Sequence, residues 1–490
     1  MLNLLIFVPI IAALGILLGA PARKTALLAG LAEFVISLLA LFSYDRAVGG
    51  FQFASQFPII PSWDLKYYVA ADGLSLVMLL LTGIVTFAAV CVTPKIERRE
   101  NLFYACVLFI TAGAAGAFAS QDLFFFYGFH ELALIPTFLL IGLWGSGERQ
   151  AAAWKITIYL ALGSFVLLIG LVDLYQALPA DARTFDMVRL QQLAVAKVIP
   201  ATAQARPFLF LLIGFGTLVS LFPFHSWAPT AYASAPTPAA MLHAGVLKKF
   251  GLYGLLRVAI PLLPEGAKHW ADLLLILLVA NILYVGLVTI AQRKLDLMLG
   301  YSSVMHMGYI FLGIASFNLI GLSGAALLMF AHGLSIAALF AIAGMIRERH
   351  LSLSFDSLGG LAKPMPFLGF AFGVAAFASI GLPGFANFAS EVMVFFGAFK
   401  NGSAALGFSS FQLATIGALW GVVISAVYML RAYKAVFLGE PDKAVVAGWT
   451  DPSASMRWPV ILLLVTLLIA GFAPNYFLSY LKPTIEALLR

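Results

Sequence analysis

Uninterrupted apolar stretches recur along almost the whole chain, and they constrain its fold more than any other feature. Each lasts about 18–25 residues, enough for a helix to cross roughly 30 Å of hydrocarbon, whereas a membrane barrel would alternate apolar and polar residues. With 62% hydrophobic and 10% charged residues among 490, the composition excludes an ordinary soluble protein. We therefore predict an all-α polytopic membrane protein.

The apolar windows divide a single membrane domain, residues 1–490, into about fourteen transmembrane spans. Residues 2–93 hold the N-terminal helices, 102–262 and 271–436 hold two larger groups, and 457–474 forms a C-terminal helix. The windows lie near residues 2–20, 25–44, 73–93, 102–120, 122–143, 156–177, 207–224, 239–262, 271–291, 298–315, 321–345, 366–399 (broken), 409–436 and 457–474.

Two of these windows are interrupted by proline. The sequence LFPFHSWAP breaks the chain at 221–229, and SIGLPGFANFASE breaks it at 379–391. Proline removes a backbone donor, and a membrane accepts the interruption only where the loosened backbone lines protein or water. Because the breaks are five spans apart, an odd number, we predict two inverted five-helix repeats, 102–262 and 271–436, each containing a broken helix.

Lysine and arginine gather in alternate connections, for example at Arg98 and Arg99. The positive-inside rule then places both termini outside. The net charge of +7 comes from such residues beside the membrane and requires no nucleic-acid partner. Two lone cysteines, Cys91 and Cys106, are too few to hold an iron–sulfur cluster.

Several ionisable residues fall near the middle of their spans. They are Glu131, Lys249, His306, His332 and, after the second break, Glu391. Counting a rise of about 1.5 Å per residue puts them near one depth, where a charged side chain costs about 2.5–3.5 kcal/mol. A lone histidine there is more often a satisfied polar group of the core, but carboxylates and an amine together favour proton transfer.

The spans carry no signature of other chemistry. The oxygen ligands of a cation cage, phosphate loops, a nucleotide fingerprint and a nucleophile triad are all missing from the sequence. We therefore predict no redox or hydrolytic centre, no metal and no cofactor in this chain.

A family resemblance rests on motifs spread over roughly residues 100–475. They are FHELALIP (129–136), AAAWKITIYLALGS (151–164), FPFHSWAP (222–229), LKKFGLYGLLR (247–257), YSSVMHMGY (301–309), AHGLS (331–335), LGGLAKPMP (358–366) and GLPGFANFASE (381–391). Together they resemble subunit M of the proton-translocating NADH:quinone oxidoreductases (respiratory complex I), the counterpart of mitochondrial NADH dehydrogenase subunit four, in the antiporter-like superfamily.

The resemblance implies roles for individual residues. Glu131 is similar to the family's essential glutamate of the fifth helix, and Lys249 to its central lysine. His306 and His332 resemble the connecting histidines, Lys155 the lysine entering the sixth helix, and Glu391 the exit-side glutamate of the second broken helix.

The resemblance also implies a setting. Such a subunit translocates protons, coupled to quinone reduction elsewhere in the complex, and belongs to a translocase enzyme without carrying a redox centre. Flavin, iron–sulfur clusters, NADH and quinone are expected in partner subunits. The expected partners are other membrane-arm subunits of complex I, including antiporter-like paralogues, and the lipid of a bacterial inner membrane.

One position departs from the family pattern. The family places a lysine, as the partner of the fifth-helix glutamate, seven residues before the histidine at 225, and this chain has Leu218 there. The candidates to replace that lysine are His130, His225, His243 and Lys248. His225 is equally well explained as a structural hydrogen-bonding residue at the helix break.

Two other functions remain open at this point. The first is a subunit of a related cation/proton antiporter or membrane-bound hydrogenase, which the sequence PTPAAMLHAG favours. The second is a structural spacer of the membrane arm that does not pump protons, for which Leu218 is the support.

Overall fold

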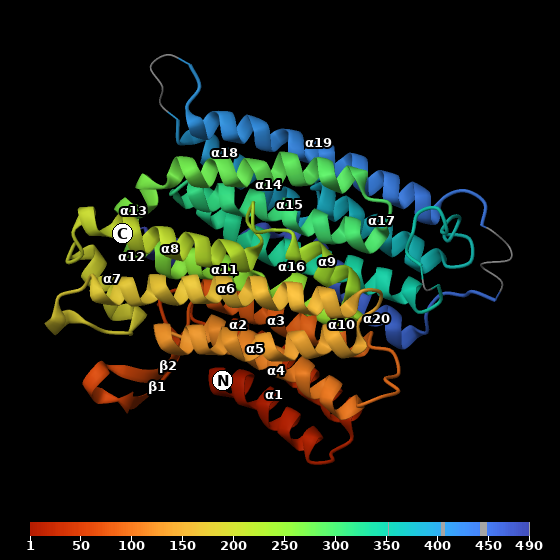
Figure 1. Cartoon of the computed structure of the whole chain (residues 1–490), viewed down its shortest axis with the longest axis horizontal. Coiled ribbons are helices and arrows are strands. Elements are labelled where there is room, and N and C mark those ends of the chain that lie inside the picture. Colours follow the sequence, from red (N-terminus) through yellow and green to blue (C-terminus); the bar gives the residue numbers. More distant parts are fainter. Residues whose placement is uncertain (351, 403–406, 442–447, 490) are drawn as a thin grey trace.

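The computed structural model describes residues 1–350, 352–402, 407–441 and 448–489. Long helices run side by side through it in one bundle (Figure 1). In the described part of the chain, eleven helices are long and apolar enough to cross a membrane. The prediction of a mostly helical, multi-spanning membrane protein is therefore confirmed.

The long helices of the first half overlap the predicted windows, whereas α7 lies in the connection between two of them. They are α1 (Leu2–Leu17), α2 (Ala22–Ser43), α3 (Gly73–Cys91), α4 (Glu100–Ala119), α5 (Leu123–Trp144), α6 (Arg149–Gln176), α7 (Met187–Val195), α8 (Ala201–Val219) and α9 (Trp227–Ser234). The following segment comprises α10 (Thr237–Leu242), a π-helical turn (His243–Leu247), α11 (Lys249–Gly254), a second π-helical turn (Leu255–Ala259), α12 (Ile260–Leu262) and α13 (Pro264–His269).

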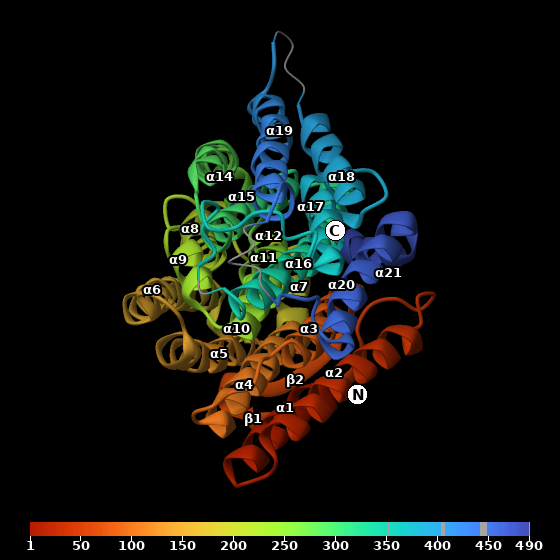
Figure 2. The same cartoon turned by 90° about the vertical axis from the view of Figure 1, so that its right-hand side faces the viewer.

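The second half continues the bundle. Its helices are α14 (Ala271–Ala291), α15 (Leu295–Ala315), α16 (Leu319–Arg347), α17 (Pro366–Ile380), α18 (Ala386–Lys400), α19 (Ser410–Phe437), α20 (Ala454–Phe472) and α21 (Pro474–Leu488). Seen along the helices, α1 and α2 form one flank and α19 lies on the opposite one, with α3 and α16 between them (Figure 2). The whole apolar window of α16 is buried, so this helix lies at the centre.

A β-hairpin makes the all-α prediction wrong at one place. Strands β1 (Gln52–Ile60) and β2 (Leu65–Ala71) pair antiparallel between α2 and α3. Aromatic and β-branched residues in β2 favour a strand, and Lys66 fixes the hairpin to the rest of the chain. Its ammonium lies 2.9 Å from the Asp186 carboxylate at the start of α7 and 3.3 Å from Asp64.

The chain breaks at both predicted places. Helix α8 ends at Val219 and α9 starts at Trp227, while α17 ends at Ile380 and α18 starts at Ala386. The residues after α8 and α17, Ser220 (φ 72°) and Gly381 (φ 82°), adopt the left-handed conformation that stops a helix.

The Asn281 side chain of α14 hydrogen-bonds backbone groups that the first break leaves without helical partners. Its Oδ1 accepts a hydrogen bond from the Phe222 amide at 2.5 Å, and its Nδ2 donates to the carbonyls of Ser220 and Val304 at 3.3 and 3.1 Å. Unpaired backbone groups are costly inside a membrane, so this buried amide stabilises the interruption.

The predicted single span at 239–262 is divided by its two π-helical turns. Two glycines of this segment, Gly245 and Gly251, allow close contacts with other helices. A Cβ atom on Gly245 would lie 3.1 Å from the Gly333 carbonyl oxygen of α16, and a Cβ atom on Gly251 would lie 2.5 Å from the Phe215 carbonyl oxygen of α8. A π-helical turn shifts the hydrogen-bonding register and leaves a backbone carbonyl free for other partners. The Ala244 carbonyl accepts a hydrogen bond from Lys249 in this way.

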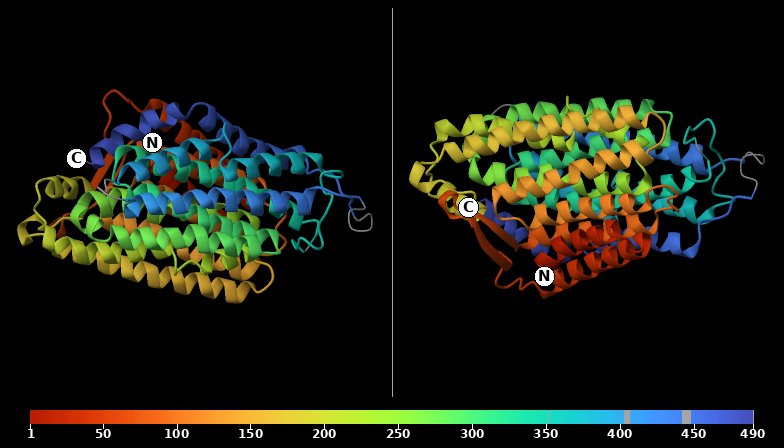
Figure 3. Two further views of the ribbon diagram at one scale, coloured as in Figure 1. Left: turned by 90° about the horizontal axis from the view of Figure 1, so that it is seen from above. Right: turned by 60° about the horizontal axis from the view of Figure 1, so that its bottom comes forward.

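Both termini lie at the same end of the bundle (Figures 1 and 3). The hairpin and α7 are also at this end (Figure 1), and Gln191 of α7 donates a hydrogen bond to the Ala487 carbonyl of α21. The sequence windows stopped near residue 474 and missed α21, whose alternation of apolar and polar residues is typical of a helix lying at a surface rather than crossing a membrane.

Candidate functional site

The Glu131 carboxylate lies on α5, between α5 and α6. It accepts a hydrogen bond from the Ser164 hydroxyl of α6, whose oxygen also lies 3.2 Å from the Tyr127 hydroxyl. The His130 Nδ1 atom is 3.6 Å from the Glu131 Oε1 atom. About a third of the Glu131 side chain, 35%, is exposed at the flank of the bundle, so this side chain is partly accessible from the side of the protein.

Leu218 occupies the position at which the resemblance implies a lysine. It is buried on α8, and its Cδ2 atom would be 3.4 Å from a Cβ placed on Gly163, the residue before Ser164. Leu218 therefore packs against α6 beside the residue that precedes Ser164. In this chain the site has only a leucine side chain.

Histidines lie on the other side of Glu131, toward the lysines. The buried His130 ring stacks on Phe250 with centroids 4.1 Å apart. His243 is also buried and lies within electrostatic reach of both His130 and Lys248. Neither ring nitrogen of His243 has a hydrogen-bond partner among the described residues. Both imidazoles can therefore take a proton from one side and return it on the other.

The two adjacent lysines point to different partners, as the helical angle between them predicts. The Lys248 ammonium lies 3.4 Å from the Ser303 hydroxyl and 5.5 Å from the centre of the Tyr232 ring. The Lys249 ammonium lies 2.7 Å from the Ala244 carbonyl oxygen and 3.0 Å from the Nδ1 atom of His332. Both side chains are fully enclosed, with at most 1% exposed.

The groups described so far, Glu131, His130, His243, Lys248 and Lys249, begin a row of ionisable side chains. The row continues from His332 on α16 to His306 on α15, and the ring centroids of these two histidines are 5.6 Å apart. The His306 ring is held at both ends: Nδ1 lies 2.8 Å from the Ser302 carbonyl and Nε2 lies 2.8 Å from the Ser379 carbonyl at the end of α17. Carbonyl oxygens only accept hydrogen bonds, so the doubly protonated imidazolium satisfies both and the neutral ring satisfies one.

Glu391 of α18 lies at the second helix break. Its carboxylate is buried against Gly381, where a Cβ would collide with Oε2. The Oε1 atom has no hydrogen-bond partner within the described ranges. Glu391 therefore shares the break with His306 but is not hydrogen-bonded to it.

Two of the predicted residues lie away from this row. Lys155 lines a polar cavity of about 650 Å³ together with Glu148, Lys294 and Asp296, at the end of the bundle opposite the termini. His225 lies within the first break, and its ring centre is 5.6 Å from that of Phe222. That position agrees with either a structural or a relay role.

Sequence reasoning missed one buried ion pair. The Arg257 guanidinium lies 2.6 Å from the Asp72 carboxylate, and both side chains are at most 5% exposed. The signal was present in LKKFGLYGLLR, where tyrosine and arginine follow Lys249 at intervals of four residues, the spacing of one helix face.

Residues 120–417 match the model of the NADH:quinone oxidoreductase/Mrp antiporter transmembrane family. The matched region contains every buried group of the row and both helix breaks. This chain belongs to that family. Within it, the chain is 35% identical to NAD(P)H-quinone oxidoreductase chain 4 of Gloeobacter violaceus, an alignment covering 100% of this chain and 92% of the relative. It is 36% identical to chain 4-1 of Synechocystis, covering 100% and 93%.

Two solved structures have the same fold as this chain. A chain of respiratory complex I from Thermus thermophilus with bound NADH superposes with a TM-score of 0.89 at 28% identity, covering 100% of both chains. A chain of the Mrp complex from Dietzia has a TM-score of 0.84 at 21% identity, covering 100% of this chain and 99% of that one, which shows the shared fold alone. The resemblance to the subunit M and chain 4 type of antiporter-like subunit is confirmed.

Proposed function

We propose that this chain is the antiporter-like membrane-arm subunit of an NADH:quinone oxidoreductase and moves protons through its buried row. One observation carries the proposal: the Lys249 amine and the His332 imidazole face each other at 3.0 Å, and at most 2% of either residue is exposed. Two cations that close repel strongly, so the pair favours a single shared proton and passes it on when a neighbour changes charge.

The first half of the row leads from Glu131 to Lys249 and Lys248. Since Leu218 supplies no amine, His130 and His243 take its place: the His130 Nδ1 atom lies 3.6 Å from Glu131, and His243 lies near both His130 and Lys248. The second half leads through His332 and His306 to the break that holds Glu391. The polar cavity at Lys155 provides water access from the end opposite the termini.

The proposal includes the finer architecture. Eleven long helices, the shorter α1, the divided pass α10–α12 and the broken pass α17–α18 together make fourteen crossings. The breaks after α8 and α17 then occupy the same place in two inverted five-helix repeats. Arg98, Arg99, Arg293 and Lys294 lie opposite the termini, which supports an orientation with both termini outside a bacterial inner membrane.

Partners and cofactors follow from the same proposal. The sideways exposure of Glu131 supports a neighbouring antiporter-like subunit covering that flank, because an uncovered carboxylate at this depth would face lipid. Flavin, iron–sulfur clusters, NADH and quinone are expected in other subunits. The coupled reaction is quinone reduction, and this chain contributes proton translocation rather than a redox centre.

The experiment is Glu131→Gln in the assembled complex, reconstituted into vesicles. We expect normal assembly but a fall of at least ~10-fold in NADH-driven proton pumping, with reduced coupled turnover, because the amide keeps the size and loses the exchangeable proton. Glu97→Gln, an exposed glutamate between α3 and α4, is the matched control. Unchanged pumping in Glu131→Gln with proven assembly would refute the proposal.

The fold alone does not separate this function from the alternatives. A subunit of a cation/proton antiporter or membrane-bound hydrogenase would purify in a complex without NADH oxidation, and its proton flux would respond to a cation gradient. A non-pumping spacer would tolerate substitution of Lys249 and His332 with no change in proton flux. Purification of the native assembly, followed by both assays, distinguishes the three.

A further inference from the structure

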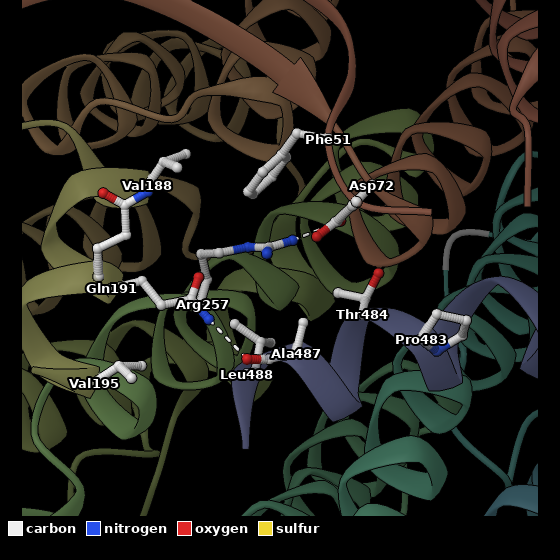
Figure 4. A pocket seen from close by; sticks show the side chains of 12 residues that line it. Phe51, Asp72, Val188, Gln191, Val195, Arg257, Pro483, Thr484, Ala487 and Leu488 are labelled. Carbon is white, nitrogen blue, oxygen red and sulfur yellow. Dashed lines mark hydrogen bonds and ion pairs between the residues drawn. The ribbon is translucent and has the colours of Figure 1, made fainter. Parts of the chain in front are cut away.

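A cavity of about 450 Å³ lies at the end of the bundle that carries both termini. This volume is typical of small-molecule sites in proteins, which enclose about 300–1,000 Å³. Figure 4 shows its walls, which include Phe51 before the hairpin, Val188 of α7 and Thr484 of α21. No side chain of the buried row is among the described residues that line the cavity, so it is a separate feature of the fold.

Thr484 supplies an unused polar group to this cavity. Only 5% of the residue is exposed, and its Oγ1 atom has no hydrogen-bond partner among the described residues. Most buried polar side chains of folded proteins are hydrogen-bonded, and an unpaired hydroxyl costs stability. Its position in the wall leaves this hydroxyl available to a bound molecule.

The Asp72–Arg257 ion pair in the same wall supplies two more groups (Figure 4). The pair joins Arg257 Nη2 to Asp72 Oδ1 at 2.6 Å. The guanidinium also donates from Nε to the Tyr253 hydroxyl at 3.3 Å, and the carboxylate also accepts at Oδ1 from the Ser75 amide at 3.1 Å. These contacts within the described residues leave the Nη1 donor and the Oδ2 acceptor for a ligand.

Aromatic rings hold the Arg257 guanidinium in place. Its central carbon lies 5.2 Å from the centre of the Phe51 ring and 5.3 Å from that of the Tyr253 ring. Cation–π attraction at this distance restricts the rotation of the side chain. A donor that is already oriented loses less freedom when a ligand binds, which favours affinity.

The charges of the cavity wall exclude a charged ligand. Arg257 and Asp72 are the ionisable residues among those described in the wall, and their opposite charges cancel. An anion would be repelled by Asp72 and a cation by Arg257, and an unpaired charge in such a site is costly. Hydroxyl groups fit instead, because each one donates and accepts hydrogen bonds. A head with several hydroxyls matches a wall that presents a donor, an acceptor and the Thr484 hydroxyl.

The rest of the wall is largely apolar and lies between two surface helices. Val188 and Val195 of α7 line the cavity together with Leu488 of α21. Both helices are apolar on one side and polar on the other, as is typical of helices lying at a membrane surface. The hydrogen bond from Gln191 to the Ala487 carbonyl, at 2.9 Å, joins them. A ligand suited to this place has an apolar chain as well as a polar head.

We propose that this cavity binds an uncharged amphiphile with a hydroxylated head, the chemistry of a monoacylglycerol. One head hydroxyl donates to the Asp72 carboxylate, and a second accepts from the Arg257 guanidinium. The Thr484 hydroxyl binds a further oxygen of the head, and the acyl chain lies along Val188 and Leu488. The site is independent of the buried row, so it stands whether or not the chain translocates protons.

The first experiment measures binding to the purified, detergent-washed complex, with a monoacylglycerol that carries a photoreactive diazirine in its acyl chain. We expect saturable cross-links to peptides of α7 or α21 that unlabelled monooleoylglycerol displaces. Lysophosphatidic acid with the same oleoyl chain adds a charged phosphate and should compete at least ~10-fold more weakly. Absence of saturable labelling, or equal competition by the phosphate compound, overturns the proposal.

Thr484→Val tests the polar part of the wall. Losing one hydrogen bond to the ligand should weaken binding by about 3- to 10-fold. Thermal unfolding should show no loss of stability, because the Thr484 hydroxyl has no partner within the described structure. Thr466→Val is the matched control, since this hydroxyl of α20 donates to the Leu462 carbonyl outside the cavity. Equal affinities in the two variants refute the assigned binding mode.

Val188→Trp tests the apolar part, because the larger side chain fills space in the cavity wall. We expect saturable labelling to disappear while native electrophoresis shows normal assembly. Asp181→Trp is the control, at an exposed position in the connection before α7 and outside the cavity. If Val188→Trp binds the probe as tightly as Asp181→Trp does, the amphiphile occupies another site and the proposal fails.

Discussion

The contact between Lys249 and His332 allows a test that separates a proton carrier from a fixed charge. Two unit charges 3.0 Å apart repel by about 5–6 kcal/mol at an effective dielectric constant of about 20. That energy corresponds to roughly a 10⁴-fold preference for one proton on the pair over two. Passing a proton along the row therefore requires Lys249 to lose its own proton at some point in each cycle.

Lys249→Arg keeps a positive charge at this position but removes the ability to release the proton, because a guanidinium stays protonated in proteins. We expect this variant to pump at least ~10-fold more slowly than the parent complex. Lys249→Met, which removes the charge, should assemble normally, since replacing a buried charge by an apolar side chain of similar volume is often neutral for stability. We expect it to lose pumping to the same extent.

The assay measures NADH oxidation and proton uptake together, in vesicles that contain the purified complex, after native electrophoresis has confirmed assembly. Lys400→Met, an exposed lysine at the end of α18, controls for the loss of a lysine as such. If Lys249→Arg pumps close to the parent rate while Lys249→Met does not, the position needs only a charge and the shared-proton argument is wrong.

Three further substitutions test other parts of the structure. His243→Gln should slow pumping, and adding Leu218→Lys should restore part of it by supplying the missing amine beside Glu131; equal rates in the parent and His243→Gln would exclude that histidine. Gly381→Ala should reduce pumping, because a Cβ there collides with the Glu391 carboxylate; Gly439→Ala, where the added Cβ meets no atom within 4 Å, is the control. Burial raises the pKa of Asp122 from 3.8 to about 6, so its ionisation lowers stability as pH rises through that range. Asp122→Asn should therefore be more stable by about 3 kcal/mol at pH 8 and little changed near pH 3, measured by thermal unfolding in detergent; a pH-independent difference would contradict the assignment.

Much of the helical layout could be predicted from local sequence. Apolar windows located the long helices because a helix must supply its own backbone hydrogen bonds in lipid, which makes every crossing a continuous apolar run. Proline located both breaks for the same reason. The hydropathy pattern did not predict the hairpin of β1 and β2 or the terminal helix α21, whose hydropathy is moderate. These elements lie at an end of the bundle, where the backbone need not supply all of its own hydrogen bonds.

The depth of the ionisable residues also follows from the sequence, because rise per residue converts position into height. The residues that they contact do not follow from the sequence. Which side chain meets Lys249 depends on how helices rotate and slide against each other, and here close contacts at Gly163 and Gly245 set that arrangement. The π-helical turns, invisible in the hydropathy, release the Ala244 carbonyl to the Lys249 ammonium.

The sequence by itself determined a membrane bundle, its two interruptions and a level of buried acids and bases, since each is a property of one segment and its distance along one helix. Only the tertiary structure decided that His332 faces Lys249, that Glu131 lies partly exposed at the flank with His130 beside it, and that Asp72 meets Arg257 beside a cavity. These are contacts between segments up to 185 residues apart, and packing alone brings such segments together.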